Sequence, residues 1–371
     1  MKILHVINSF EGGGAEKLTL QIHQMCLQQG IDSHALSLMQ SSAGSLPNAY
    51  SLGFDSPYQL SVPFKLYSFL SQPQWKDINV IHVHLFPSQL FTPIISRYLN
   101  LKASLITTEH STVNWRRNKF YGKLIDKIFY SFYQRIICVC SAAADSLLDS
   151  QPQLMKKITT IHNGIDIQEY LPNSTLKIKG NTPIIISIGR LVELKNYATA
   201  IRALNKISEQ AFEYWILGSG VLEYELRELV NSLNLESKVK FLGFRTDVPD
   251  LLHQADIFLL TSLWEGFNLS LLEAMAAELP VIVSNVPGVR EAVTEESDEK
   301  SHVAFLVEPL SEDDIANKLS KLLADQNLRL TMGKNAQIRS SRFDIKQTVT
   351  KYIDLYQKMS VNNLSTFTPT K

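Results

Sequence analysis

One stretch in the second half of the chain decides how the sequence is interpreted: residues 261–279 are Thr-Ser-Leu-Trp-Glu-Gly-Phe-Asn-Leu-Ser-Leu-Leu-Glu-Ala-Met-Ala-Ala-Glu-Leu. The apolar runs on either side, Asp256-Ile-Phe-Leu-Leu and Pro280-Val-Ile-Val-Ser, are short enough for buried strands. Between them, Glu265-Gly-Phe indicates a turn and the apolar residues after it indicate a helix. This order of strand, turn, helix and strand is typical of a parallel sheet covered by helices.

Two carboxylates frame the start of this expected helix. Glu265 lies in the turn, and Glu273 follows eight residues later in an apolar segment, where an unpaired charge would be costly. We therefore expect Glu273 to bind a pair of hydroxyl groups or a cation. A helix that begins at the carboxyl end of a strand presents backbone N–H groups and the positive end of its dipole, which suits a phosphate. The alternative is a surface helix with two solvated glutamates.

The two glutamates, with Glu-Gly-Phe at the first and Leu-Glu-Ala-Met at the second, resemble the signature of the retaining GT-B glycosyltransferases of family 4. The resemblance implies that Glu273 holds the ribose hydroxyls of a nucleotide-sugar donor. It also implies that Glu265 and the backbone that follows it face the transferred sugar and the diphosphate, at Gly266, Phe267, Asn268 and Leu269. Many relatives carry glycine, proline or serine where this chain has Asn268, so the choice of donor sugar stays open.

Length and composition favour two α/β domains. A chain of 371 residues accommodates two domains of about 150–200 residues each. The 36 basic and 36 acidic residues give no net charge, which argues against a dedicated nucleic-acid-binding protein. The three cysteines form no evenly spaced framework, so we expect reduced, packed thiols.

Strand-like and helix-like segments alternate in both halves, as in a doubly wound parallel sheet. Residues 41–73 show no clear pattern, and the polar passage 168–183 reads as a linker. With this alternation, the family resemblance implies the GT-B fold, with two Rossmann-like domains that face each other across a cleft. The expected limits are 1–167 for an acceptor-binding domain, 168–345 for the donor domain, and 346–371 for a helix that crosses back to the first domain and a polar tail. Strands are expected at 2–8, 33–39, 80–85, 104–108, 135–139, 158–162, 184–188, 214–217, 239–242, 257–260, 281–283 and 304–307.

A basic loop follows the first strand of the second half. Its sequence, Gly189-Arg-Leu-Val-Glu-Leu-Lys-Asn, places Arg190 and Lys195 between a strand and a helix. A fixed guanidinium and a flexible ammonium can neutralise a diphosphate as it leaves. An exposed basic loop without a role is the alternative, but with Glu273 the pair resembles the donor diphosphate site of the same family.

Two glycine-rich loops raise a dinucleotide-binding alternative. Gly12, Gly13 and Gly14 join the first strand to the first helix, and Gly218 and Gly220 follow a strand of the second half. Neither has the full G-x-G-x-x-G spacing with a ribose-binding carboxylate about 20 residues further on, which argues against a nicotinamide cofactor. The family resemblance places the first loop beside the acceptor and the second near the nucleotide, where Arg245 also follows a strand.

Histidines and one asparagine complete the candidate site. His110 follows a strand, and the resemblance puts it against the donor sugar; a histidine satisfied by loop backbone is the alternative. His82 and His84 share one face of a strand, but no third ligand has the spacing of a metal site, so packed or cleft-lining histidines are expected. Asn163, in the sequence Asn-Gly-Ile-Asp, resembles the turn at the domain junction of this family.

No Asp-x-Asp pair follows a strand, so we expect no metal ion and no cofactor besides the nucleotide sugar. Arg190, Lys195 and helix-start amides would then stabilise the leaving diphosphate. The family resemblance implies a front-face, retaining transfer, in which the departing phosphate oxygen accepts the proton of the acceptor hydroxyl.

The expected location is the cytoplasm, because the N-terminal apolar run is too short for a signal peptide and no segment is long enough to span a membrane. Residues 115–123 mix basic and aromatic residues ahead of an apolar helical stripe that ends near Tyr133. Such a segment can bind anionic lipid or can simply pack a helix on its sheet. The resemblance favours peripheral contact with the membrane.

The sequence therefore predicts a hexose or N-acetylhexosamine transferase. The expected donor is a UDP-sugar and the expected acceptor a glycan or lipid-linked glycan of the cell envelope. The alternatives are another GT-B enzyme such as a nucleotide-sugar epimerase, a noncatalytic nucleotide-sugar-binding subunit and, last, a nicotinamide dehydrogenase. A guanosine donor is equally compatible with Glu273.

Overall fold

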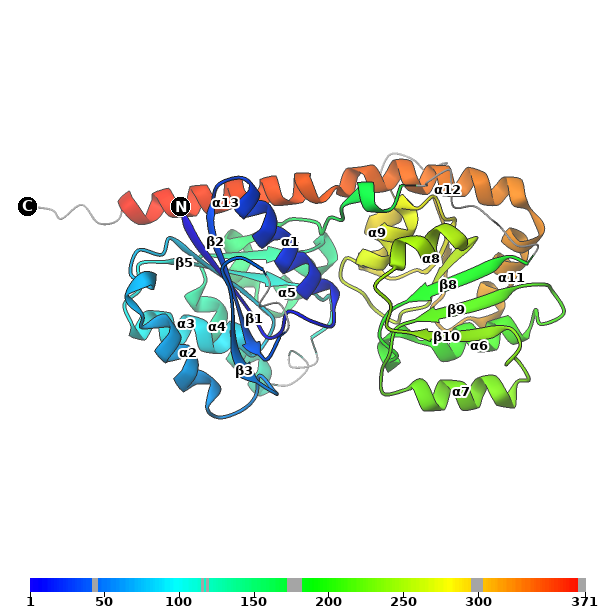
Figure 1. The fold of residues 1–371 in the computed structure, drawn as a ribbon, viewed down its shortest axis with the longest axis horizontal. Helices are drawn as coiled ribbons and strands as arrows, with labels where there is room; N and C mark the ends of the chain where they lie inside the picture. Colours follow the sequence, from blue (N-terminus) through cyan, green and yellow to red (C-terminus); the bar gives the residue numbers. More distant parts are fainter. Residues whose placement is uncertain (42–45, 115–116, 118–119, 172–181, 295–302, 366–371) are drawn as a thin grey trace, which may run out of the picture. The chain divides into compact units, whose positions relative to one another are not determined.

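The computed structural model describes residues 1–41, 46–114, 117, 120–171, 182–294 and 303–365. The chain divides into two units, one formed by Met1–Asn163 with Ile345–Lys371 and the other by Gly164–Asp344 (Figure 1). Each is built around its own parallel sheet.

The sheet of the first unit has seven parallel strands in the order β3-β2-β1-β4-β5-β6-β7. Its strands are β1 (Lys2–Ile7), β2 (Asp32–Met39), β3 (Ala49–Phe54), β4 (Val80–His84), β5 (Ser104–Glu109), β6 (Arg135–Cys138) and β7 (Ile158–Thr160). Its helices are α1 (Gly14–Gln28), α2 (Val62–Leu70), α3 (Ser88–Tyr98), α4 (Phe120–Phe132), α5 (Ser141–Ser150) and α13 (Ile345–Ser365).

The sheet of the second unit has six parallel strands in the order β10-β9-β8-β11-β12-β13. Its strands are β8 (Ile184–Ile188), β9 (Glu213–Leu217), β10 (Val239–Gly243), β11 (Ile257–Leu260), β12 (Val281–Ser284) and β13 (Ala304–Val307). Its helices are α6 (Tyr197–Asn205), α7 (Glu223–Ser232), α8 (Val248–Gln254), α9 (Leu269–Ala276), α10 (Pro287–Val293), α11 (Glu312–Ala324) and α12 (Gln326–Ser340), with short 3-10 turns η5 (Ile167–Glu169) and η6 (Glu193–Lys195).

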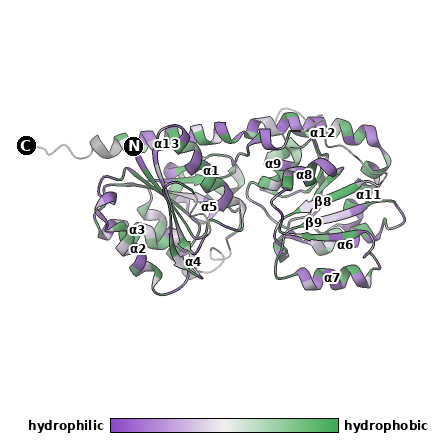
Figure 2. Ribbon diagram, viewed as in Figure 1, coloured by the Kyte–Doolittle hydropathy of each residue, from purple (hydrophilic) through white to green (hydrophobic). Residues whose placement is uncertain are grey.

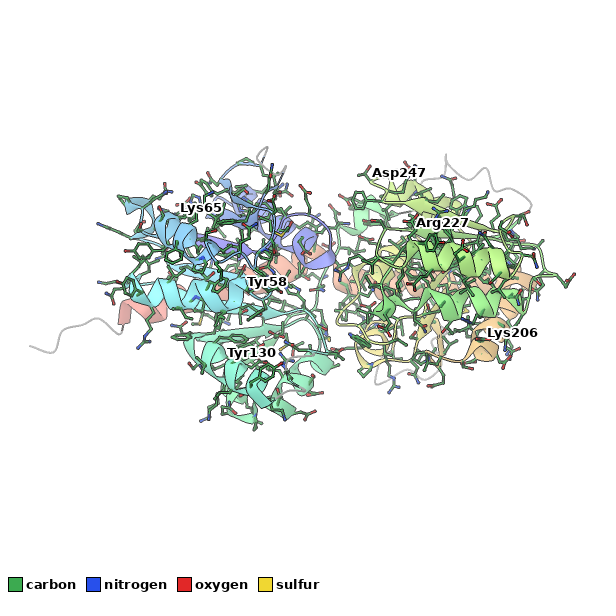
Figure 3. The ribbon with its side chains drawn as sticks, turned by 90° about the horizontal axis from the view of Figure 1, so that it is seen from below. Tyr58, Lys65, Tyr130, Lys206, Arg227 and Asp247 are labelled. Atoms are coloured by element: carbon green, nitrogen blue, oxygen red, sulfur yellow. The ribbon has the colours of Figure 1, made fainter. Side chains whose placement is uncertain are left out.

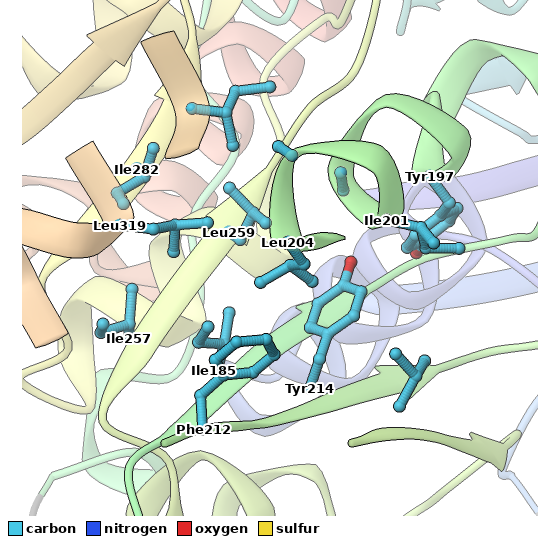
Figure 4. Packing of buried hydrophobic residues seen from close by; sticks show 14 of the residues in the cluster. Ile185, Tyr197, Ile201, Leu204, Phe212, Tyr214, Ile257, Leu259, Ile282 and Leu319 are labelled. Atoms are coloured by element: carbon cyan, nitrogen blue, oxygen red, sulfur yellow. The ribbon is translucent and has the colours of Figure 1, made fainter. Parts of the chain in front are cut away.

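Apolar side chains between sheet and helices hold the second unit together (Figure 4). Strand residues such as Ile185, Ile257 and Ile282 pack against helix residues such as Leu204 and Leu319, and all are fully buried. Hydropathy follows this arrangement: in Figure 2, α7 carries both hydrophilic and hydrophobic residues along its length, because only one of its faces covers the sheet.

The final helix, α13, belongs to the first unit. Its buried face, including Val349, Tyr352 and Tyr356, packs in one cluster with Ile3 of β1 and Leu18 of α1. The Ser104 hydroxyl also donates to the carbonyl of Met359 at 3.0 Å. Helix α13 therefore packs within the first unit, although the chain reaches it only after the second unit.

Two details differ from the sequence expectation. Residues 164–167 belong to the second unit, because Ile165 forms a bridge with Asp344 and its N–H donates to the carbonyl of Phe343 at 3.0 Å. Residues 41–73, which showed no clear pattern, contain the edge strand β3 and helix α2. Most of the expected linker, 172–181, lies outside the described residues, as do 115–116 and 118–119 of the expected lipid-binding segment.

Among the helices that the structure describes, none combines the length and the apolar character needed to cross a membrane. The cysteines Cys26, Cys138 and Cys140 are buried and no disulfide joins them, as expected for packed thiols.

Candidate functional site

The second sheet has a topological switch point between β8 and β11, where the strand order reverses. From β8 the strands proceed to β9 and β10 on one side, and from β11 they proceed to β12 and β13 on the other. In open α/β sheets, ligands bind outside the carboxyl ends of the strands at such a switch point. The loops that follow β8 and β11 contain the basic pair and the Glu265 turn that sequence analysis identified.

Backbone and side-chain hydrogen bonds join these two loops. Asn196, in a left-handed conformation, donates its side-chain amide to the carbonyl of Thr261 at 3.3 Å. The Thr261 hydroxyl donates to the carbonyls of Lys195 and Asn196, each at 3.1 Å. The N–H of Leu263 donates to the carbonyl of Leu194 at 2.8 Å. Residues from the two sides of the switch point are therefore held in a fixed relation.

Lys195 and Glu265 form an ion pair at this point. The Lys195 Nζ lies 2.5 Å from Glu265 Oε1, and the Ser262 hydroxyl donates to the same oxygen at 2.7 Å. The two charged side chains are only 13% and 11% exposed. An ammonium has three N–H groups, so Lys195 can keep this pair and still donate to a ligand oxygen.

Glu273 lies on α9 and is 6% exposed. Its Oε1 accepts a hydrogen bond from the Tyr170 hydroxyl at 2.9 Å. A protein group therefore takes one acceptor position of this carboxylate, and its contact with a pair of ligand hydroxyls stays a prediction. Tyr170 is itself anchored, because its carbonyl lies 3.0 Å from His253 Nε2. Burial, and then the neighbouring carboxylate, raise the pKa of the Tyr170 hydroxyl, which stays a proton donor.

Glycines allow the loop after β9 to contact the loop after β8. A Cβ on Gly218, whose φ is +130°, would lie 2.1 Å from the carbonyl oxygen of Gly189, and one on Gly220 would lie 2.3 Å from that of Leu191. Gly189 in turn lies against Lys195, whose Cε would be 3.0 Å from an added Cβ. These glycines are therefore explained by the close packing of the two loops. A dinucleotide-binding site is not needed to account for them.

The two candidate arginines of this edge are both exposed. No described residue pairs with the Arg190 guanidinium, so it can reach a ligand. Arg245 forms an ion pair with Asp247, whose carboxylate lies 2.5 Å away and raises the arginine's pKa. A ligand phosphate would have to compete with Asp247 for Arg245.

The residues after Glu265 are largely occupied within the unit. Gly266 lies against the first turn of α10, because a Cβ on Gly288 would come within 1.8 Å of its carbonyl oxygen. The ring of Phe267 packs on Phe343, with centroids 5.0 Å apart. The Asn268 side chain caps α9 by accepting from the N–H of Leu271 at 2.9 Å, and Leu269 is buried. The side chains of Phe267, Asn268 and Leu269 are thus engaged or buried. The predicted contact of these residues with a sugar or diphosphate would therefore be made by their backbone atoms.

The first unit has a switch point of its own, between β1 and β4. Gly12, Gly13 and Gly14 follow β1 and are exposed, and Gly12 has a φ of +105°. Asn163 is buried at the end of this unit, beside His162, whose carbonyl accepts from Thr348 of α13 at 3.1 Å. This contact agrees with a structural role for the turn.

Buried histidines lie between these strands. His5 of β1 is the register partner of His82 of β4, and ring centroids of His82 and His84 are 4.0 Å apart. His84 Nδ1 lies 3.3 Å from Nε2 of His110, which is half-buried just after β5. Burial lowers the pKa of His5 to about 3 and that of His110 to about 4, and holds the pKa of His82 and His84 well below the usual value.

Among the described residues, His5, His82 and His84 are the one group of three whose ligand atoms, all within 4.8 Å of one another, could hold a metal ion. The sequence indicated two of them but not His5. The missing signal was strand order: only the pairing of β1 with β4 brings His5 beside His82.

The expected lipid-binding segment needs a correction at Arg117. This residue is buried, with its guanidinium 2.8 Å from Glu109 and 3.2 Å from Asp126, so it cannot contact lipid. Tyr130, labelled in Figure 3, joins the same network through hydrogen bonds with Arg117 and Glu109. Along α4, however, Tyr121, Leu124 and Ile128 are about half exposed.

Sequence comparison assigns both units to one family. The family model described as Glycosyltransferase Family 4 matches residues 12–169, and the one described as Glycosyl transferases group 1 matches residues 173–339. The UDP-Gal:alpha-D-GlcNAc-diphosphoundecaprenol alpha-1,3-galactosyltransferase of Escherichia coli is 29% identical over 317 residues, which cover 80% of this chain and 79% of that protein. The N-acetyl-alpha-D-glucosaminyl L-malate synthase of Bacillus anthracis is 27% identical over 325 residues, or 83% and 82% of the two chains.

Solved structures share the fold. The Anabaena protein HepE in complex with UDP superposes with a TM-score of 0.80 at 21% identity, over 96% of this chain and 100% of that one. WaaG, a glycosyltransferase involved in lipopolysaccharide biosynthesis, superposes with a TM-score of 0.74 at 17% identity, over 95% and 99% of the two chains. The two family models, which together cover both units, show that the chain belongs to the family 4 glycosyltransferases. The superpositions and the two Rossmann-like units show the GT-B fold.

Proposed function

We propose that the protein is a retaining, metal-independent glycosyltransferase that moves a hexose or N-acetylhexosamine from a UDP-sugar to a glycan or lipid-linked acceptor of the cell envelope. The observation that carries this proposal is the group at the β8–β11 switch point: the Lys195–Glu265 ion pair, with the buried carboxylate of Glu273 on the helix that follows. It combines a cation for a diphosphate with a carboxylate for ribose hydroxyls.

Lys195 and Arg190 would bind the diphosphate of the donor. Lys195 is held by Glu265, so its ammonium is oriented before the donor arrives, and Arg190 is exposed and can close on the second phosphate. Preorganised cations stabilise the charge that grows on the leaving group without the cost of reorienting solvent. These two side chains supply the positive charge that a metal ion supplies in other transferases.

Glu273 would bind the ribose. One of its oxygens already accepts from Tyr170, which fixes the plane of the carboxylate, and a carboxylate has about four acceptor positions. A carboxylate that binds ribose hydroxyls accommodates uridine and guanosine equally. UDP is proposed because the names of the E. coli relative and of the HepE structure specify UDP-Gal and UDP.

The transfer would proceed on one face of the sugar. The bond between C1 and the β-phosphate oxygen breaks, the acceptor oxygen bonds to C1 from the same side, and the acceptor's proton passes to the departing phosphate oxygen. Neither Glu265 nor Glu273 is then needed as a nucleophile, which suits their engagement with Lys195 and Tyr170. The names of relatives that specify alpha-linked products support retention where the UDP-sugar is itself α-linked.

The acceptor is proposed to bind at the first unit, near Gly12, Gly13 and Gly14, with His110 against the donor sugar. Lipid-linked acceptors are named for the E. coli protein and for a Campylobacter jejuni transferase that is 28% identical over 272 residues. We infer a cytoplasmic enzyme in peripheral contact with the membrane through α4, where Leu124 and Ile128 are exposed beside Lys123 and Lys127. Vesicles with and without anionic lipid would test this contact, and equal flotation of wild type and a Leu124→Ser/Ile128→Ser variant would refute it.

Calorimetry with UDP, GDP and NAD⁺ in the presence of EDTA tests the donor site. Binding of UDP alone is expected, and release of UDP from one member of a panel of UDP-galactose, UDP-glucose and their N-acetylated forms should follow. A requirement for added Mg²⁺ or Mn²⁺ would contradict metal independence. An acceptor product whose anomeric configuration, read by NMR coupling, is opposite to that of the donor would contradict retention.

The other candidate functions give different outcomes in the same assays. An epimerase would change the sugar with no acceptor present, a binding subunit would bind UDP-sugar without turnover, and a dehydrogenase would bind NAD⁺. The intact pair of Lys195 and Glu265 is the observation that disfavours a noncatalytic subunit.

A further inference from the structure

A hydrogen bond between two histidines links β4 to the residue proposed to face the donor sugar. His84 is the last residue of β4 and is fully buried, and His110 directly follows β5. The two strands are neighbours, with His84 in register with Thr108, and His84 Nδ1 lies 3.3 Å from His110 Nε2. One of these nitrogens must carry the hydrogen and the other must accept it.

The ring of His84 cannot turn away from this contact without disturbing the core. It packs on the ring of His82, tilted by 41° with centroids 4.0 Å apart. Nδ1 of His82 bonds the Tyr356 hydroxyl and Nε2 bonds the Thr108 hydroxyl, both at 2.7 Å. His82 is thus fixed by α13 on one side and by β5 on the other. His84 is held between this anchored ring and His110.

The other nitrogen of His84 favours one direction for the hydrogen bond. Among the described residues, Nε2 of His84 has no hydrogen-bond partner and is inaccessible to solvent. If His110 donated, Nδ1 of His84 would accept, and the single hydrogen of the neutral His84 ring would be on Nε2. That hydrogen would form a buried N–H group without an acceptor. If His84 donates, Nε2 is a bare lone pair. Unpaired buried donors are rarer than unpaired buried acceptors, so donation by His84 is favoured.

We propose that His84 is a positioning residue that donates to Nε2 of His110 and so holds His110 as the tautomer with hydrogen on Nδ1. His110 can then offer the substrate an N–H donor and no accepting nitrogen. It would orient a sugar hydroxyl and would not act as a base, which agrees with transfer of the acceptor's proton to the departing phosphate. This inference rests on the proposed function for the contact of His110 with the donor.

Burial keeps His110 neutral near pH 7, because its pKa is lowered to about 4. A neutral imidazole has a single N–H, and its location decides what the ring can recognise. A hydrogen bond to the distant nitrogen is a common way to fix that location.

The same histidines allow a competing interpretation, in which His5, His82 and His84 bind a metal ion. Both nitrogens of His82 are occupied by hydroxyl groups, and the group contains no carboxylate or thiolate to offset the charge of a divalent ion buried there. We therefore argue for hydrogen bonding and treat metal binding as an outcome of the test.

The experiment is a ¹⁵N–¹H correlation spectrum of the histidine rings in the full chain, with elemental analysis of the same sample. Wild type and His84→Asn, whose amide can replace the Nδ1 donor, should show His110 with hydrogen on Nδ1. His84→Leu should show both tautomers and a kcat/KM lower by about tenfold or less, for release of UDP from the UDP-sugar that the panel identifies. The matched control Ser104→Ala removes a buried hydroxyl of the same unit that bonds the carbonyl of Met359 and not a histidine, and it should leave the His110 signals unchanged.

Three results would overturn the proposal: hydrogen on Nε2 of His110 in the wild type, an unchanged tautomer in a folded His84→Leu variant, or a stoichiometric metal ion in the purified protein. The spectrum needs no substrate. An Nδ1–H signal in a protein without transferase activity would therefore support the role of His84 while refuting the proposed function.

Discussion

The two units end their sheets in the same topology but fill the switch points with opposite chemistry. At the β8–β11 edge, charged side chains are paired and partly exposed, as in Lys195 with Glu265. At the β1–β4 edge, the imidazoles of His5, His82 and His84 are buried and neutral. One fold can therefore place paired charges at the switch point of one unit and neutral imidazoles at that of the other, because the loops and the inward-facing strand residues differ while the sheet does not.

The contrast also concerns how each edge is held. The charged edge depends on loops joined by hydrogen bonds, such as those of Thr261 to the backbone of residues 195 and 196. The neutral edge depends on strand register and on the final helix, which supplies Tyr356. Changes that remove charge should therefore impair donor binding, whereas changes that add charge to the histidines should destabilise the first unit.

Acidification should have the largest effect, and it should act on the first unit. Burial lowers the pKa of His5, His82 and His84 in the folded state. Below about pH 6.5 the unfolded chain therefore binds more protons, and stability falls as the pH falls towards the folded pKa, which is about 3 for His5. At about pH 5 the lowered pKa of His5 should reduce the free energy of unfolding by about 2 kcal/mol, and the lowered pKa values of His82 and His84 act in the same direction. Hydrogen exchange at about pH 7.5 and pH 5, corrected for intrinsic rates, should show the first unit opening first. Equal loss of protection in both units would contradict the assignment of the acid-sensitive histidines to the first unit.

Lys195→Ala should have the next largest effect. Removal of one preorganised donor to a developing charge typically lowers catalytic rate by about 10²–10³-fold, which we expect for kcat/KM of UDP release. Lys206→Ala is the matched control, because Lys206, labelled in Figure 3, also pairs with carboxylates but on the exposed surface. Equal activity of the two variants would remove Lys195 from the donor site.

Glu273→Gln should weaken UDP binding by about 10–100-fold, since hydrogen bonds to a charged group contribute about 1.5–3 kcal/mol. Binding of inorganic pyrophosphate should stay the same, because Glu273 is assigned to the ribose. Calorimetry with the two ligands checks both statements, and a parallel loss of pyrophosphate binding would mean that the variant disturbs the whole edge.

Gly288→Ala should weaken the packing of α10 on Gly266, because the new Cβ would lie 1.8 Å from the carbonyl oxygen of Gly266. Forced overpacking of this kind costs about 1–3 kcal/mol. If the Glu265–Gly266 turn faces the transferred sugar, affinity for the UDP-sugar should fall more than affinity for UDP. Equal losses for both ligands would move the turn away from the sugar.

Tyr170→Phe should have the smallest effect, a loss of UDP affinity of less than about tenfold, because it removes one hydrogen bond to Glu273 but leaves the carboxylate. Tyr214→Phe deletes a buried hydroxyl that bonds Ser187 in the core of the same unit, far in sequence from Glu273. A larger effect of the control on UDP binding would show that Tyr170 does not orient the ribose site.

Much of the fold was predictable because local pattern and topology agree. The strands of the second half lie within a residue or two of their expected limits. Edge strand β3 was missed because its residues alternate weakly and follow a polar, serine-rich passage. Its position depends on pairing with β2, which local sequence does not reveal.

The candidate site was predictable as a set of residues but not as a set of contacts. Lys195 and Glu265 were both expected, yet their pairing joins positions 70 residues apart. Tyr170 was hidden in a stretch interpreted as linker, and Arg117 was interpreted as exposed although its two carboxylate partners bury it. Each of these contacts depends on strand order or loop packing, which act over long sequence separations.

The most direct test of the contrast is hydrogen exchange of the full chain with and without saturating UDP. UDP should protect residues 189–196, 218–220 and 261–273, the loops of the charged edge, and should leave the strand ends around His84 and His110 unchanged. Protection confined to the first unit would contradict the assignment of the donor site to the β8–β11 switch point.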